Sequence, residues 1–531
     1  MPSSLNPLTY IKTFKEFSLK TETDCQRAEI FSYFAADRLI WVYDDGKKGC
    51  WWFYNNCVWK RDPSGTYARR VAHDLFNAIQ DRFSKIIMAY RSLSERKSKG
   101  LTDKEKNQLT KLSSMMNVIN RFGSSTSVKH MIEESTEMMS VSVDVFDDNP
   151  YLVNFKDGTI DLHDYSFHDH DPSDMLTQVM GCSYNGEEYF DRFNQFLGEI
   201  FKGDNQMIEY VQKIFGYSLF GQAPLEKFFI FYGATTRNGK STILTTIQSV
   251  MGDYAAATKA ETWALKTQSD SGKASPDLAK LQKSRLVVTE EPNSRLNLNL
   301  ALIKGVTGND VISTRELYRS EKSWIAGFKL IFNTNFLPVF NDTTLFDSKR
   351  VNVIKFNRHF EEDEIDATLK DQFREPAVKT AIAHWMIEGY KKYKSDGLSA
   401  PQSVIDATEA YQFDGDKIHQ FFVEAMEINA DARIKGSDVY RAYTLYCQLN
   451  GLRALSKQNF FQELRKRDVL QKSATINHAT CRNVVVGFQF NHDWILEMNP
   501  NSDYAAAAKA KPSAFQEKIM NDTRIDNLKV S

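Results

Sequence analysis

The chain has 531 residues, of which 42% are hydrophobic and 25% are charged. These proportions lie close to globular averages and exclude a collagenous, mucin-like or wholly disordered chain. At about 150 residues per domain, the length predicts three or four domains. The 67 Lys and Arg residues are balanced by 68 Asp and Glu residues, so the net charge is −1 and any basic surface must be local.

The sequence predicts neither a membrane segment nor a secretion signal. Its longest apolar runs are far shorter than the roughly 20 residues that cross a bilayer. The first 20 residues lack the basic start, apolar centre and cleavage site of a signal peptide. No CxxC pair occurs, which favours reduced cytosolic thiols over disulfides or a zinc site. We therefore expect a cytoplasmic protein with no membrane partner, whose cysteines are Cys25, Cys50, Cys57, Cys182, Cys447 and Cys481.

Residues 1–135 predict a mainly helical N-terminal α+β module. Residues 28–60 alternate aromatic and polar side chains around turn-forming dipeptides, which predicts a small β-hairpin module. Helical spacing follows from residue 68 to residue 121. Within it, residues 91–100 are strongly polar, which favours a solvated helix end or loop over a nucleic-acid contact.

The middle of the chain predicts two regions, residues 136–222 and 223–360. The first contains a hairpin signal at 152–162 and helical periodicity at 189–219. In the second, an apolar strand runs through a glycine-flanked loop into a helix, the order typical of a nucleotide-binding α/β core. The strand is expected at 228–232 and the helix at 240–251, and further strands are expected at 285–289, 311–318, 324–332 and 350–356.

The remaining residues predict a helical extension, a small domain and a tail, at 361–416, 417–495 and 496–531. Pro401 marks a break in the extension. The small domain reads as three helices followed by a two-stranded hairpin, a winged-helix outline. Its helices are expected at 417–430, 436–450 and 456–467 and its strands at 474–476 and 484–490. The tail is expected to be a marginal helix or to lack structure, and the fold class is multidomain, α/β and α.

A candidate phosphate-binding loop follows the strand at 228–232, with the sequence Gly233-Ala-Thr-Thr-Arg-Asn-Gly-Lys-Ser-Thr242. Backbone N–H groups and the helix N-terminus of such a loop surround phosphates, the lysine reaches the terminal phosphates and the hydroxyl after it binds Mg²⁺. The loop is one residue longer than the usual pattern. Its candidate binding residues are Gly233, Thr236, Arg237, Asn238, Gly239, Lys240, Ser241 and Thr242.

Paired carboxylates, Glu290 and Glu291, end the β-branched strand at 285–289. An NTPase requires an acid at the end of a neighbouring strand to hold Mg²⁺ and activate the attacking water. Glu290, with Ser241, is therefore the candidate metal ligand and Glu291 the candidate general base. The alternative is a solvated acidic turn.

Two later residues complete the candidate catalytic set. Asn335 ends another apolar strand, where its amide can bond the γ-phosphate or the water, or can simply cap the strand. Arg350 precedes the strand at 350–356. An arginine stabilises the charge on a transferred phosphoryl group, and in ring ATPases a neighbouring subunit supplies it. Arg350 is the first candidate for this role, ahead of Lys349 and Arg358.

The order and spacing of these motifs resemble a superfamily 3 helicase and, more closely, the poxvirus and phage/plasmid primase-helicase group. The segments are Asn238-Gly-Lys-Ser-Thr242, RLVVTEEP at 285–292, IKGVTGND at 303–310 and FKLIFNTN at 328–335. They correspond to the Walker A, Walker B, B′ and C motifs of that family. Segments before and after them also look like its helicase-preceding and C-terminal regions.

This resemblance implies an AAA+-like ATPase core that assembles as a hexameric ring, with ATP and Mg²⁺ at subunit interfaces. It implies single-stranded DNA in the channel and 3′-to-5′ translocation. The B′ hairpin is expected to contact DNA at its tip through Arg319 and Lys322, and Lys304 is expected to face the channel or the nucleotide. A solvated turn is the alternative for the tip. Members with a primase half carry a polymerase-like domain ahead of these regions, and no such activity is expected here.

The winged-helix region adds a basic cluster at Arg465, Lys466 and Arg467. Such helices enter the major groove or bind phosphates, although a solvated face or a protein-docking surface would look the same. The sequence therefore predicts an ATP-dependent replicative DNA helicase of a virus, phage or mobile element, with a neutral exterior and a basic channel. Its expected partners are single-stranded and forked DNA, further copies of itself, and a separate primase or polymerase. An ATP-dependent replication initiator or loader is the alternative, and a small-molecule P-loop kinase fits less well.

Overall fold

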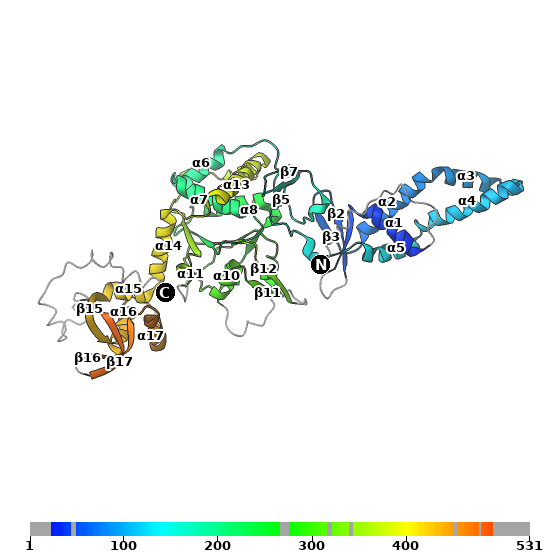
Figure 1. Cartoon of the computed structure of the whole chain (residues 1–531). Coiled ribbons are helices and arrows are strands. Elements are labelled where there is room, and N and C mark those ends of the chain that lie inside the picture. Colours follow the sequence, from blue (N-terminus) through cyan, green and yellow to red (C-terminus); the bar gives the residue numbers. More distant parts are fainter. Residues whose placement is uncertain are drawn as a thin grey trace.

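The computed structural model describes residues 23–43, 49–265, 276–315, 321–338, 344–450, 452, 454–476 and 479–491. Figure 1 shows an elongated molecule, in which an N-terminal module, a central α/β body and a small C-terminal domain follow one another. No helix in these ranges is both long and apolar enough to cross a membrane. All six cysteines are free thiols.

The N-terminal module joins a sheet of order β3-β2-β1-β4 to a group of helices. The prediction of strands at 28–60 is confirmed at 39–43, 50–54 and 59–60 but wrong at 28–35. There the chain is helical, since Thr23 and Gln26 form a capping box that starts α1 and its apolar side chains face the module core. The elements are α1 (Asp24–Ala35), β1 (Leu39–Tyr43), β2 (Cys50–Tyr54), β3 (Trp59–Asp62), α2 (Thr66–Arg82), α3 (Ser84–Arg96), η3 (Lys97–Lys99), α4 (Asp103–Arg121), α5 (Ser125–Met138) and β4 (Ser140–Ser142).

The region before the central sheet contributes a three-stranded sheet and two helices. The predicted hairpin at 152–162 is confirmed as β5 (Leu152–Asn154) and β6 (Thr159–Asp161), with β7 (Phe167–His168) beside it. The predicted helical stretch forms α6 (Asp191–Ile200) and α7 (Asn205–Tyr217). Helix α7 packs backbone to backbone on a later helix, α13 (Pro376–Asp396), since a Cβ atom at Gly389 would lie 2.2 Å from the carbonyl oxygen of Gln212.

The central sheet is parallel and has the order β14-β8-β13-β10-β9. Side chains of β8 alternate between its two faces: Phe229 and Phe231 pack with α7, α8 and α13, whereas Phe228 and Ile230 pack with α10. Figure 1 shows these helices on opposite sides of the sheet. The elements are β8 (Phe228–Tyr232), α8 (Lys240–Met251), β9 (Ala255–Thr258), α9 (Pro276–Ala279), β10 (Leu286–Thr289), α10 (Leu300–Thr307), β13 (Lys329–Thr334), α11 (Thr344–Asp347) and β14 (Val351–Lys355).

The expectation of one strand at 324–332 is wrong. Two strands occupy this stretch: β12 (Glu321–Ile325), which pairs with β11 (Val311–Arg315) in a separate hairpin, and β13 of the central sheet. Gly327 lies between them, where a Cβ atom would be only 2.1 Å from the carbonyl oxygen of Gly221. This close approach of two backbones redirects the chain and separates the hairpin from the sheet.

After the sheet come the helices α12 (Leu369–Gln372), α13 and α14 (Gln402–Gly415), and Pro401 is the N-cap of α14. The C-terminal domain contains α15 (Lys417–Ala425), β15 (Met426–Lys435), α16 (Gly436–Leu449), α17 (Lys457–Lys466), β16 (Leu470–Ile476) and β17 (Ala479–Phe490). The predicted helix at 417–430 is wrong beyond residue 425. Strand β15 begins there and pairs with β17, in the order β15-β17-β16. The predicted tail lies outside the described residues.

Two buried cations, Arg285 and Lys329, join the preceding region to the sheet at the starts of β10 and β13. The Arg285 guanidinium donates to the carbonyl oxygens of Leu219 and Leu152. The Lys329 ammonium donates to those of Phe220, Gln222 and Gly327 and lies 4.4 Å from the ring centroid of Tyr217. Burial lowers the pKa of both groups. Carbonyl oxygens near the C-terminal end of α7 therefore stabilise both charges, and the Asp147 carboxylate adds a favourable electrostatic interaction for Arg285.

Replacing Lys329 with Ala should lower the free energy of unfolding by about 3 kcal/mol or more, because it leaves buried carbonyl oxygens without donors. Urea unfolding followed by tryptophan fluorescence measures the change. The exposed Lys280 provides a matched control, and Lys280→Ala should shift stability by less than about 0.5 kcal/mol. Equal midpoints for both variants would contradict this role of Lys329.

Candidate functional site

The glycine-flanked loop connects β8 to the N-terminus of α8 and is shaped by residues with left-handed backbone angles. Arg237 has φ 55° and Gly239 has φ 81°. A Cβ atom at Gly239 would lie 2.3 Å from Cγ2 of Ile200 in α6, so only glycine fits. The buried Asn238 accepts from the backbone N–H of Lys240 at 3.2 Å and donates to the carbonyl oxygen of Thr235 at 2.6 Å. The loop is therefore held at the end of a helix whose free N–H groups can receive an anion.

Lys240 is the first residue of α8, and its side chain is almost completely buried. Its ammonium donates to the carbonyl oxygen of Thr334 at 2.7 Å and to Oδ1 of Asn335. Burial lowers the pKa of Lys240 to about 8, against the opposing effect of the Glu291 carboxylate. The lysine is thus a desolvated cation whose present partners are neutral oxygens.

Asn335 also contacts Glu291, one of the two acids after β10. Its side-chain amide donates to the carboxylate of Glu291, so Lys240, Asn335 and Glu291 form a connected chain of hydrogen bonds. Glu290 is anchored by its backbone, which donates to the carbonyl oxygen of Thr258 at 2.7 Å, while its side chain is exposed. Strand β13 lies between β8 and β10, which explains why residues far apart in sequence meet at this edge.

A cavity of about 330 Å³ opens beside the loop. Arg237, Asn238, Gly239, Ser241 and Thr242 line one side of it. Sequence reasoning missed the other side, which includes Arg192, Phe196 and Glu199 of α6 together with Phe360, Glu364, Ile365, Asp366, Leu369 and Lys370. No motif marks these residues, because they meet the loop only through tertiary packing. The cavity combines apolar walls with charged groups at the end of a phosphate-type loop, a composition suited to a nucleotide base and sugar.

The segment after β14 forms hydrogen bonds with Thr236 and Arg237 of the loop. The carbonyl oxygen of Thr236 lies 2.8 Å from Nδ1 of His359, and that of Arg237 accepts from the backbone N–H of Phe360 at 2.8 Å. The Arg237 guanidinium also lies 3.4 Å from the Glu362 carboxylate. Thr236 and Arg237 are therefore exposed loop residues, held in place by contacts with the segment that follows β14.

Arg350 lies away from this site within its own chain. It precedes β14, at the opposite edge of the sheet from the loop. Its guanidinium pairs with the Glu226 carboxylate and donates to the Lys304 carbonyl oxygen at 3.3 Å and to Oγ1 of Thr307 at 3.1 Å. Lys349 is exposed, and Arg358, the third candidate, pairs with Glu364.

The candidate DNA-binding residues lie in different surroundings. Lys304 is half-buried on α10, and Arg319 lies outside the described residues. Lys322 stands opposite Thr314 in the β11–β12 hairpin and lines a cavity of about 570 Å³ that also includes Asp144, Asp147 and Asp148. The predicted contact of the hairpin tip with DNA stays a prediction.

In the C-terminal domain, Arg465 and Lys466 are exposed near the end of α17. Arg465 donates to Oδ1 of Asn483 at 3.0 Å, and Lys466 pairs with Glu463 at 2.7 Å. Arg467 is instead buried and pairs with Asp416 at 2.9 Å. The structure therefore does not place Arg467 on the basic surface expected from the sequence. It joins the end of α17 to Asp416, whose carboxylate caps α15.

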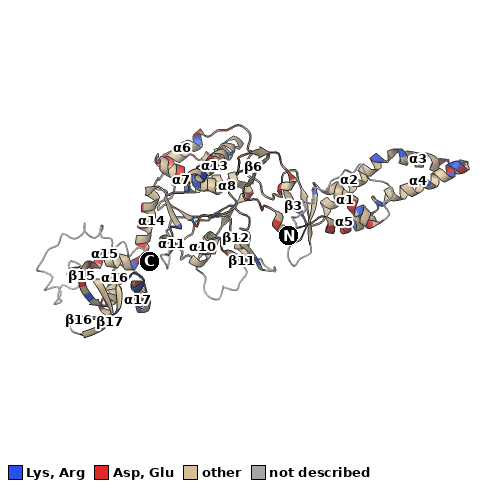
Figure 2. Ribbon diagram, viewed as in Figure 1, with Lys and Arg blue, Asp and Glu red and all other residues tan. Residues whose placement is uncertain are grey.

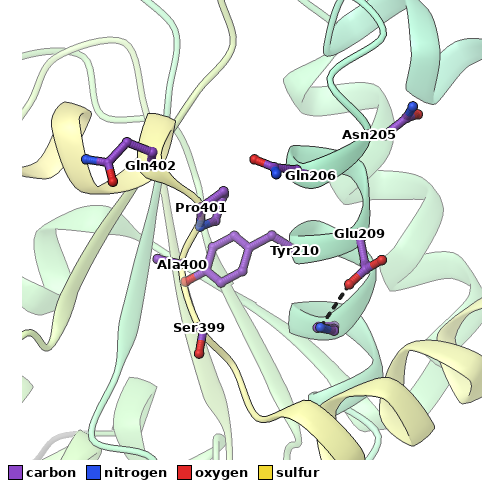
Figure 3. A pocket seen from close by; sticks show the side chains of 9 residues that line it. Asn205, Gln206, Glu209, Tyr210, Ser399, Ala400, Pro401 and Gln402 are labelled. Atoms are coloured by element: carbon purple, nitrogen blue, oxygen red, sulfur yellow. Dashed lines mark ion pairs between the residues drawn. The ribbon is translucent and has the colours of Figure 1, made fainter.

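Another cavity, of about 630 Å³, lies between α7 and residues 399–402 (Figure 3). Tyr210 projects into it, and Glu209 forms an ion pair at 2.9 Å with Lys213. None of the phosphate-loop residues lines this cavity. We therefore place the candidate nucleotide site at the smaller cavity beside α8.

Comparison with known families gives two matches, on either side of the phosphate loop. A family model described as D5 N terminal like matches residues 28–202, and one described as Poxvirus D5 protein-like matches residues 414–494. Two separate segments of this chain therefore match D5 family models. The resemblance to the poxvirus group that the motifs indicate is thereby confirmed.

Similar proteins come from large DNA viruses. The chain is 25% identical over 424 residues to "Putative helicase L207/L206" of Acanthamoeba polyphaga mimivirus, covering 75% of this chain and 42% of that protein. It is 27% identical over 241 residues to "Putative helicase 022R" of Frog virus 3, covering 42% and 25%. It thus spans less than half the length of these relatives. A solved structure, the C-terminal region of NrS-1, is 14% identical over 57% of this chain and 77% of that chain, with a TM-score of 0.37.

The low pKa of Lys240 predicts that nucleotide binding takes up a proton. The free lysine is about half deprotonated near pH 8, whereas phosphate oxygens beside it favour the charged form. Above pH 8 the ATP association constant should therefore fall, approaching tenfold per pH unit. Calorimetry at pH 8 in two buffers of different ionisation enthalpy should give an uptake of about 0.5 proton.

Lys240→Arg is the control for this measurement, because a guanidinium stays protonated over the whole range. It should remove the proton uptake. Binding by the unsubstituted chain with no buffer dependence would contradict the assignment of Lys240 as the phosphate-facing cation.

Proposed function

We propose that this D5-domain chain is an ATP-dependent DNA helicase that acts as a ring in the replication of a large DNA virus. The observation that carries the proposal is the hydrogen-bonded chain from Lys240 through Asn335 to Glu291, at the N-terminus of α8. It joins a phosphate-binding cation, an amide and a carboxylate, the groups that phosphoryl transfer to water requires. The D5 domains and the names of the relatives support the choice of helicase among ATPases.

ATP and Mg²⁺ are the proposed cofactors. The exposed Ser241 hydroxyl and Glu290 carboxylate are hard oxygen donors of the kind that Mg²⁺ prefers, and they fit its binding. When bound, the ion neutralises charge on the β- and γ-phosphates. The loop residues Gly233 to Thr242 would surround the phosphates, and the cavity beside α6 would hold the base and sugar.

The hydrogen-bond chain suggests how binding prepares hydrolysis. In the described state, Lys240 donates to Thr334 and Asn335, and Asn335 holds Glu291. Phosphates that attract the Lys240 ammonium would release Asn335 to turn its amide toward the γ-phosphate. Glu291 would then be free to orient a water and accept its proton, as a general base does.

The sheet order and the C-terminal domain support the finer assignments. A strand inserted between the phosphate-loop strand and the strand that carries the acids suits an AAA+-like ATPase, and the α-β-α-α-β-β order of the C-terminal domain suits a winged helix. We propose that Arg465 and Lys466 contact DNA from that domain, and that Lys304, Arg319 and Lys322 do so from the core. We further propose a homohexamer that translocates 3′-to-5′ on single-stranded DNA and acts with a separate primase or polymerase.

The direct test is unwinding of a forked duplex with a 3′ single-stranded tail. Lys240→Ala should reduce both ATP hydrolysis and strand separation to background, because the phosphates lose their cation. Glu291→Gln should lower the hydrolysis rate by about two to four orders of magnitude while leaving ATP binding in place. Lys394→Ala, at an exposed position outside the site, serves as the control and should act like the unsubstituted chain.

Hydrolysis at the original rate by Lys240→Ala would overturn the assignment. ATP-dependent assembly on DNA without strand separation would favour a replication initiator or loader instead.

The proposed trans role of Arg350 has its own test. If Arg350 acts on the ATP of a neighbouring subunit, Arg350→Ala and Lys240→Ala should each be inactive but regain hydrolysis when mixed. In the mixture, some subunit interfaces combine the intact phosphate loop of an Arg350→Ala subunit with the intact Arg350 of a Lys240→Ala subunit. Glu226→Gln tests the alternative, since Glu226 only holds Arg350 within its own chain. A loss of activity in Glu226→Gln equal to that of Arg350→Ala, with no recovery on mixing, would assign Arg350 a structural role.

A further inference from the structure

The α3–α4 hairpin is an arm that extends away from the rest of the molecule (Figure 1). Helix α3 and helix α4 pack against each other and are joined by η3 and Gly100, which has φ 87°. Thr102 and Glu105 form a capping box that fixes the start of α4. Since α4 has 19 residues, the arm is about 28 Å long. The candidate nucleotide site uses no part of it.

Positive charge is concentrated on this arm. Residues 84–121 contain nine Lys or Arg and three Asp or Glu, a net charge of +6, so the rest of the chain carries −7. Figure 2 shows Lys and Arg along α3 and at the far end of the arm. Two of the three acids are already engaged, since Glu105 pairs with Arg96 at 2.9 Å and Asp103 with Lys106 at 3.0 Å.

Several cations of the arm remain available to a partner. They are exposed, and in the described part of the chain none has a carboxylate within ion-pair distance: Arg91, Lys97, Lys99, Lys104 and Lys111. Three of these five, Lys97, Lys99 and Lys104, lie at or near the turn between the two helices. A polyanion that approached the end of the arm would meet these charges first.

We propose that the arm binds duplex DNA through the phosphate backbone. Lys is depleted at protein–protein interfaces, which favours a nucleic acid over an acidic protein as the partner. Proteins that hold single strands stack bases on aromatic side chains, whereas Tyr90 is the only aromatic residue of the arm and is half-buried. Exposed cations along a straight hairpin, with no exposed aromatic ring beside them, can pair with the phosphates of a duplex. Duplex DNA carries one charge per about 1.7 Å of its axis.

This inference depends on the proposed function only for the choice of DNA. From the sequence, residues 91–100 were expected to form a solvated helix end or loop, and the structure shows where this segment lies. That stretch is a solvated helix end, as predicted, but it is also the end of a projecting basic arm. In a helicase such an arm would hold the parental duplex while the ring acts on one strand.

The test uses the full chain, without nucleotide, and a blunt 30-base-pair duplex of mixed sequence labelled with fluorescein. Anisotropy gives the association constant at several KCl concentrations. The quadruple variant R91S/K97S/K99S/K104S should bind at least about tenfold more weakly at 0.1 M salt. The slope of log K against log[salt] should become shallower by roughly 2 to 4, since each phosphate contact contributes about 0.9.

A matched variant removes four exposed cations elsewhere, K60S/R69S/K280S/K394S, and should leave the affinity and the slope unchanged. Circular dichroism checks that both variants are folded. Equal losses in the two variants, or an unchanged slope in the arm variant, would overturn the proposal. So would a loss of self-association in sedimentation with unchanged duplex binding, since the arm would then be a protein contact.

ATP hydrolysis in the absence of DNA separates this inference from the proposed function. The arm variant should hydrolyse ATP at the rate of the unsubstituted chain. A different result is that the unsubstituted chain fails to hydrolyse ATP and still shows a steeper salt dependence of duplex binding than the arm variant. That result would refute the proposed helicase but support DNA binding by the arm.

Discussion

In the central sheet, β13 lies between β8 and β10, and the candidate site depends on this order. The strands are parallel, so the segments that follow them emerge at one edge, on neighbouring positions. Lys240 and Asn335 are 95 residues apart in sequence, and Asn335 and Glu291 are 44 apart, yet each pair is hydrogen-bonded. Asn335 bonds both partners because its strand is the middle one. A sheet in which β10 was adjacent to β8 would leave the amide outside this chain of contacts.

The same two strands, β10 and β13, are anchored at their other ends by buried cations. Within the described residues neither Arg285 nor Lys329 forms an ion pair with a carboxylate. Both are stabilised by carbonyl oxygens that follow α7, and by the rings of Tyr254 and Tyr217. Desolvation is unfavourable for both charges, as their lowered pKa values show. Several convergent peptide dipoles offset that free-energy cost. The preceding region can therefore pack on the sheet only in the position that brings these carbonyl oxygens to the two cations. The region that carries α6, and with it one wall of the nucleotide cavity, is thereby fixed relative to Lys240.

Local patterns predicted the central motif well and the surroundings poorly. The apolar run before Gly233 and the helix after Gly239 have the predicted bounds because their determinants are contiguous in the chain. Residues 426–430 of strand β15 were expected to be helical, since the strand acquires its β pairing only from β17, more than 40 residues later. Arg192 of the cavity and the buried partner of Arg467 are likewise set by tertiary packing, for which the sequence carries no periodic signal. The four motifs nevertheless indicated a resemblance to the poxvirus primase-helicase group before any packing was known.

The net charge of −1 conceals a separation of charge that changes the expected electrostatic map. The expectation of a neutral exterior with a basic channel assumes that cations outside the channel are spread evenly over the surface and balanced by nearby acids. Instead, Arg285, Lys329 and Arg467 are buried, and the arm carries +6 against −7 elsewhere. At physiological salt, charges are screened over about 8 Å, and the arm is several times longer than that. The acidic remainder therefore cannot cancel the field at the end of the arm, and a polyanion there meets a basic protein although the chain as a whole is nearly neutral.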